Sequence, residues 1–212
     1  MSDIGIIVFG FVSLFLATFS SIAGGGGGFI ATPLMIFLGL SPAESIANGK
    51  FMGLSLAIGN LGVMKKQKLH SWPIILPLMV VALAVGLVVP QLITKLEGDV
   101  YQRLIGILIL AMVPVMHFKK LGHTSREVSS NRKIFGFVAV STALFMQGLF
   151  SSGMGALVSL SLVSFMGMTA MEASVTRRYV QLLLNSVIVI GLLWSGLVMW
   201  KLVAVGATTN FI

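Results

Sequence analysis

The sequence predicts an all-α polytopic membrane protein, and three observations support this fold class. The chain of 212 residues is 57% hydrophobic and only 9% charged, and its mean hydropathy is +1.03. Soluble domains of ordinary composition do not approach these values. The apolar residues form continuous runs, several of which are about 20 residues long, the length that crosses a bilayer as a helix. Continuous runs, without alternating apolar and polar residues, exclude a membrane β-barrel.

Eight apolar stretches divide the chain into expected helices. The first, residues 4–23, lacks the basic start and the cleavage site of a secretory signal, so we expect a retained helix. Two stretches, residues 29–40 and 156–168, have the shorter length of half-spanning or re-entrant segments. The remaining stretches are expected to be the longer spans, residues 45–64, 72–93, 104–118, 134–150 and 179–200.

Basic residues set the predicted topology. The net charge is +8, and lysine and arginine concentrate in residues 65–68 and 119–133. Both segments should face the cytoplasm, because the positive-inside rule retains short basic loops there. The same rule accounts for the positive charge without an anionic macromolecule, so no nucleic-acid partner is expected.

An internal repeat is the next feature of the sequence. An ungapped offset of 128 residues, the spacing from Glu44 to Glu172, also aligns Trp72 with Trp200 and several glycines with one another. We therefore expect a single transmembrane domain over residues 1–212 that contains a duplication. Its parts are repeat one at about 4–118, a cytoplasmic basic loop at about 119–133, and an incomplete repeat two at about 134–212.

The alignment of the two copies also predicts their orientation and an early end. The basic residues 65–68 align with the uncharged residues 193–196, which favours an inverted second copy. A parallel second copy stays open if the short segments are re-entrant. Because Ile212 aligns with Ala84 inside a span, the C-terminus looks truncated by roughly 30 to 40 residues, at about 20 per span.

Each predicted copy has a glycine-rich break before its short helix. Glycine runs end helices, and non-helical backbone at membrane depth is tolerated only inside protein or beside a cavity. The start of the following half-helix offers free N–H groups to an anion, so we expect anion binding at both breaks. The alternative is close helix packing, which the spacing of Gly24 and Gly28 would suit. The candidate binding residues are Gly24, Gly25, Gly26, Gly27 and Gly28 in the first break, and Ser151, Ser152, Gly153 and Gly155 in the second.

Polar side chains inside the predicted spans add further candidates. Arg178, Gln181 and Asn185 are spaced to share one helix face, and arginine suits bidentate contact with an oxyanion. The alternative for Arg178 is extension to the cytoplasmic surface, and this is the expected position of Arg177. Other candidates for lining the substrate site are Thr32, Asn48, Lys50 and Gln147.

Two glutamates stand three residues after a hydroxyl side chain, Glu44 after Ser41 and Glu172 after Thr169. This is the spacing of a capping box, so we expect each glutamate to cap the start of a long helix. The alternative role is to carry a proton that couples transport, as intramembrane carboxylates do in pumps and transporters.

Residues 24–72 read GGGGGFIATPLMIFLGLSPAESIANGKFMGLSLAIGNLGVMKKQKLHSW. This segment resembles the first-half signature of the TauE/SafE family of sulfite exporters, also called TSUP permeases. Residues 152–155, 166–169 and 195–200 resemble the weaker second-half pattern. The resemblance covers nearly the whole chain. It implies a multi-pass carrier of the bacterial inner membrane that moves sulfur-containing organic or inorganic anions.

Other classes of protein fit less well. The histidines His70, His117 and His123 lie at predicted helix ends or in basic loops, and no HExxH motif or intramembrane aspartate pair occurs. The chain has no cysteine. We therefore predict no enzyme, no cofactor and no metal site, and instead a secondary carrier that moves sulfite, a sulfonate or a related small anion by alternating access. An anion channel, or a truncated membrane subunit that does not transport, remains the alternative, and homo-oligomerisation is left open.

Overall fold

The computed structural model describes residues 3–22, 28–62, 71–95, 98–100, 103–104, 106–107, 128–150 and 154–211. The regular structure of these residues is helical and includes no strand, which confirms the predicted fold class. Within them, three helices are long and apolar enough to cross a membrane: α5 (Trp72–Lys95), α7 (Ser130–Phe150) and α9 (Ala170–Leu192).

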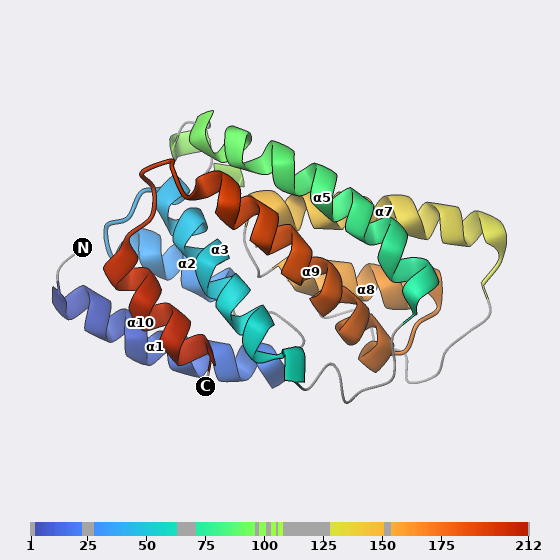
Figure 1. Cartoon of the computed structure of the whole chain (residues 1–212), viewed down its shortest axis with the longest axis horizontal. Coiled ribbons are helices and arrows are strands. Elements are labelled where there is room, and N and C mark those ends of the chain that lie inside the picture. Colours follow the sequence, from blue (N-terminus) through green and yellow to red (C-terminus); the bar gives the residue numbers. More distant parts are fainter. Residues whose placement is uncertain are drawn as a thin grey trace.

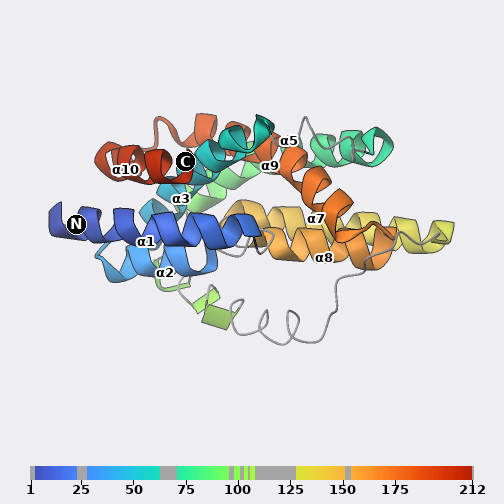
Figure 2. The ribbon, with the colours of Figure 1, turned by 90° about the horizontal axis from the view of Figure 1, so that it is seen from below.

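The predicted order of a long helix, a short helix and a second long helix occurs in both halves of the chain. The first half has α1 (Asp3–Ile22), α2 (Gly28–Phe37) and α3 (Pro42–Gly59), and the second has α7, α8 (Gly155–Met166) and α9. In the described residues, α5 follows the first set and α10 (Trp200–Phe211) follows the second. In Figure 2, α1 lies beside α2, and α7 lies beside α8, as their contacts also show.

One boundary differs clearly from the apolar pattern. The long helix expected over residues 179–200 begins at Ala170 and ends at Leu192, and a turn with a left-handed Gly196 (φ 73°) follows it. Hydropathy does not register this start, whereas the capping box predicted for Thr169 and Glu172 agrees with it.

Two glycines end the short helices. Gly39 follows α2 with φ 95°, and Gly167 follows α8 with φ 71°. This left-handed conformation is the one in which glycine commonly stops a helix. No atom lies within 4 Å of a Cβ built on Gly39, so its backbone conformation, and not a lack of space, calls for glycine.

The helix starts of the two halves correspond at the offset of 128 residues, to within one residue. The helix that follows each set packs against the other set. Thus α5 packs against α7 and α9, whereas α10 packs against α1 and α3 (Figure 1). The duplication and the inversion of its second copy remain predictions.

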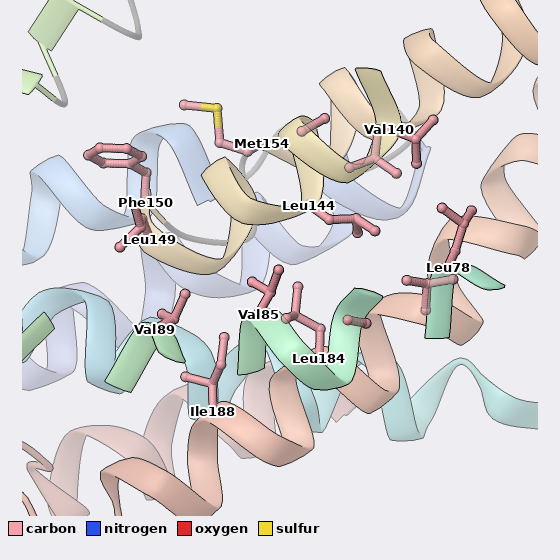
Figure 3. Close-up of a cluster of buried hydrophobic side chains, with 14 of the residues drawn as sticks. Leu78, Val85, Val89, Val140, Leu144, Leu149, Phe150, Met154, Leu184 and Ile188 are labelled. Atoms are coloured by element: carbon pink, nitrogen blue, oxygen red, sulfur yellow. The ribbon is translucent and has the colours of Figure 1, made fainter. Parts of the chain in front are cut away.

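The main apolar core lies between α5, α7 and α9. Figure 3 shows side chains such as Val85, Leu144 and Ile188 meeting there. Gly86 brings α5 close to α9, since a Cβ at this position would lie 2.8 Å from the Val187 side chain. A second apolar cluster joins α1, α2, α3 and α10.

The surface and the interior have the polarity of a membrane-embedded protein. Large apolar side chains such as Phe11 and Val80 are 67% and 69% exposed. In contrast, Lys50 and Arg177 are only 1% and 4% exposed. Charged side chains buried among membrane helices are costly, so they indicate a functional region.

Candidate functional site

Both candidate glutamates close capping boxes. The Ser41 backbone N–H donates to Glu44 Oε2 at 2.8 Å, and the Glu44 N–H donates to Ser41 Oγ at 3.2 Å. The same two bonds join Thr169 and Glu172, with the same distances. The predicted capping role is therefore confirmed at the start of α3 and of α9.

This geometry makes a prediction for Glu172. Replacement by Ala should lower the free energy of unfolding by about 1 kcal/mol, because the first turn of α9 loses its reciprocal cap. Glu172→Gln should keep stability, since glutamine also closes a capping box, and it tests the alternative expectation that Glu172 carries a proton that couples transport. Thermal unfolding in detergent and flux in proteoliposomes measure the two effects. If Glu172→Gln folds normally but its flux no longer responds to a proton gradient, Glu172 carries the coupling proton.

Lys50 connects α3 to the end of α7. Its ammonium group donates to the backbone carbonyl of Gln147, in the last turn of α7. Carbonyls in the last turn lack a partner within the helix, and the helix dipole favours a positive charge there. The side-chain amide of Gln147 is completely buried, and neither its Oε1 nor its Nε2 has a hydrogen-bond partner among the described residues.

Arg177 reaches the start of α8. Its Nη1 donates to Gln181 Oε1 at 3.0 Å, and a Cβ built on Gly155, the first residue of α8, would lie 2.4 Å from that Nη1. Its Nε has no hydrogen-bond partner in the described part of the chain. The expectation that Arg177 extends to the cytoplasmic surface is wrong, because α9 turns this side chain inward with Gln181, four residues later.

The neighbouring Arg178 takes another direction. It is half-buried, and its Nη1 donates to Oδ1 of Asn60, the residue that ends α3, at 3.1 Å. Arg178 therefore does not share its contacts with Gln181, as the predicted common helix face required; Gln181 bonds to Arg177 instead. The spacing of Arg177, Gln181 and Asn185, four residues apart on α9, was the sequence signal that could have identified Arg177.

The other candidates occupy different surroundings. Asn48 is buried and holds the segment after α9: its Nδ2 donates to the Leu197 carbonyl at 3.2 Å, and the Met199 N–H donates to its Oδ1 at 2.9 Å. Thr32 is buried in α2. Asn185 is buried, and its amide has no hydrogen-bond partner among the described residues.

The two glycine-rich breaks lie largely outside the described residues. Gly24, Gly25, Gly26 and Gly27 precede Gly28, the first residue of α2, and Ser151, Ser152 and Gly153 lie between α7 and α8. The described residues on either side of the second break are informative. Lys50 contacts the last turn of α7, and Arg177 lies against the first residue of α8. Two basic side chains from different helices thus meet the two helix ends that flank this break.

In the ranges that the structure describes, no group of three or more histidine, cysteine, aspartate or glutamate side chains could hold a metal ion. The polar groups that are present suit an anion: an ammonium, a guanidinium and amide N–H groups.

Comparison with known proteins identifies membrane transporters as relatives of this chain. The chain is 26% identical over 189 residues to a "Probable membrane transporter protein" of Haemophilus influenzae, an alignment that covers 88% of this chain and 74% of the relative. It is 25% identical over 198 residues to the "Probable membrane transporter protein ORF9" of a Sinorhizobium species, covering 92% and 76% of the two chains. No solved structure matches the chain. The model of the family described as "Sulfite exporter TauE/SafE" matches residues 9–212, so the chain is a membrane transporter that belongs to the TauE/SafE family.

Proposed function

We propose that this protein is a secondary carrier of small anions in the bacterial inner membrane, and that its substrates are sulfite, sulfonates or related sulfur-containing anions. The observation that carries the proposal is the burial of Lys50 and Arg177 among the membrane helices. Neither side chain forms an ion pair with a described residue: Lys50 donates to a backbone carbonyl, and Arg177 donates to a side-chain amide oxygen.

An unpaired buried charge is unfavourable, because moving each ion out of water costs on the order of several kcal/mol. Transporters resolve this cost when the substrate supplies the opposite charge. The carboxylates of Glu44 and Glu172 are not available for this purpose, because both hold helix caps. A small anion would therefore complete the charge balance of the interior, and its departure would leave the site unsatisfied and ready for another.

Alternating access fits the arrangement of the helices. Among the described helices, α5 of the first half packs with α7 and α9, α10 of the second half packs with α1 and α3, and α3 packs on α9. A rocking motion of one set against the other would change which side of the membrane reaches the region between Lys50 and Arg177. This motion distinguishes a carrier from a channel, which would conduct without it.

The test is transport of radiolabelled sulfite into proteoliposomes that contain the full chain. We expect saturable uptake that accelerates when the vesicles are preloaded with unlabelled sulfite, because a carrier exchanges substrate at each turn. Uptake is measured with and without a proton gradient, and methanesulfonate and acetate serve as competing anions. Flux that neither saturates nor responds to preloading would indicate a channel. A folded protein that passes none of these anions would overturn the proposal.

A further inference from the structure

We infer that the transported oxyanion binds at the start of α8, where it would contact both the guanidinium of Arg177 and the first backbone N–H groups of that helix, and that Gly155 lets the guanidinium lie against this helix end. This inference rests on the proposed function, since it names the residues that would hold the anion. It assigns the main charge contact to Arg177 and not to Arg178.

The first observation concerns the start of α8. The helix has 12 residues, and its N-cap residue, Met154, makes no side-chain capping bond. In contrast, α3 and α9 begin with complete capping boxes. The N–H groups in the first turn of a helix have no intrahelical acceptor, and together they carry a partial positive charge. An anion is the natural partner of such an end.

The second observation is independent and concerns Arg177. This side chain comes from α9, is 4% exposed, and has its Nη1 directly beside Gly155. Gln181 holds Nη1 in place at 3.0 Å, while Nε remains without a partner among the described residues. A guanidinium therefore faces the positive end of a helix, and the two repel each other. An anion that contacts both groups adds two attractions that offset this repulsion.

Gly155 limits what can occupy this position. Any side chain there would place its Cβ 2.4 Å from Arg177 Nη1 and 3.3 Å from Cζ, so the guanidinium would have to move. The absence of a side chain thus allows close approach of backbone and guanidinium.

The geometry of the donors selects a chemical class of ligand. Guanidinium N–H groups point in parallel and match two oxygens on one atom, as in sulfite, a sulfonate or a carboxylate. A halide ion offers no such pair of oxygens. We therefore expect sulfite and methanesulfonate to compete with each other for this site, and chloride to compete poorly.

The experiment compares substitutions of Arg177 in the full chain by sulfite titration calorimetry in detergent and by flux in proteoliposomes. Arg177→Gln should weaken sulfite affinity roughly a hundredfold, and Arg177→Lys roughly tenfold, because lysine keeps the charge but loses the two-donor geometry. Arg132→Gln is the matched control: it removes one exposed arginine, which donates to the Ser164 carbonyl at 2.8 Å, and it should not change affinity. Thermal unfolding of each variant separates lost binding from lost folding.

A substitution of Gly155 tests the same site if the Arg177 variants do not fold. Gly155→Ala should also weaken sulfite affinity, because its methyl group displaces the guanidinium. The loss of sulfite affinity in the double variant Gly155→Ala, Arg177→Lys should be smaller than the sum of the two single losses in free energy. Both substitutions disturb the same contact, so their effects are not additive.

The outcomes distinguish this inference from the proposed function. If the unmodified protein neither binds nor moves an oxyanion, the proposed function fails. If it does both, and folded variants at Arg177 and Gly155 retain its affinity, the inference is overturned while the proposed function stands. Loss of affinity confined to Arg178→Gln would return the charge contact to Arg178.

Discussion

Replacing Lys50 with methionine is expected to lower anion flux at least about tenfold while the protein stays folded. The substitution removes the buried ammonium that, with Arg177, would attract the anion, and charged hydrogen bonds are worth roughly 1.5–3 kcal/mol, or about tenfold to a hundredfold in affinity. Methionine has a similar length and fills the same space. The lost bond to the Gln147 carbonyl is offset because a charge no longer has to be buried, so stability should change by no more than about 1–2 kcal/mol.

Flux per folded molecule and thermal unfolding in detergent together measure this expectation. Lys201→Met provides the control, because Lys201 is an exposed lysine in the first turn of α10 and its loss removes the same charge from the surface. The opposite pattern, a marked loss of stability with normal flux per folded molecule, would show that Lys50 serves only to hold the end of α7.

Replacing Gly86 with leucine should have the largest effect on folding. This residue lies where α5 meets α9, and a Cβ would already sit 2.8 Å from the Val187 side chain and 3.5 Å from the Leu184 carbonyl. The remainder of a leucine side chain cannot enter without separating the two helices. Overpacking of this kind typically costs about 1–3 kcal/mol, and the rigid β-branched neighbour places this site near the upper end. Because α9 also carries Arg177 and Gln181, flux should fall together with stability.

The matched control is Gly62→Leu. No atom lies within 4 Å of a Cβ at Gly62, and the residue is exposed, so stability should change by no more than about 0.5 kcal/mol. Thermal unfolding of both variants in one detergent gives the comparison. Equal stability of the two proteins would mean that α5 and α9 can move apart at no cost, which contradicts their close packing.

Some properties of this protein follow from short-range patterns that a sequence displays directly. Composition and the length of the apolar runs predicted helices that cross a membrane, and three helices meet this condition within the described residues. Glu44 and Glu172 were expected to cap helices because each partner lies only three residues away. A glycine follows each short helix, and these two glycines, Gly39 and Gly167, are both left-handed. In each case, the groups that interact are neighbours along the chain, so their spacing alone specifies the contact.

The candidate site depended on contacts that spacing does not specify. The bond from Lys50 to Gln147 joins residues 97 positions apart, and Arg178 to Asn60 joins residues 118 positions apart. Arg177 and Arg178 are adjacent and chemically identical, so their sequence favours neither for the interior. The packing of α9 against α8 on one side and α3 on another decides that Arg177 lies buried beside Gly155 while Arg178 meets the end of α3. The sequence by itself therefore determined the membrane-embedded helices, their caps and their turns, because these arise from local interactions and hydropathy. Only the tertiary structure decided which of two neighbouring arginines enters the interior, because a helix rotates consecutive side chains by about 100° and packing selects which of them is covered.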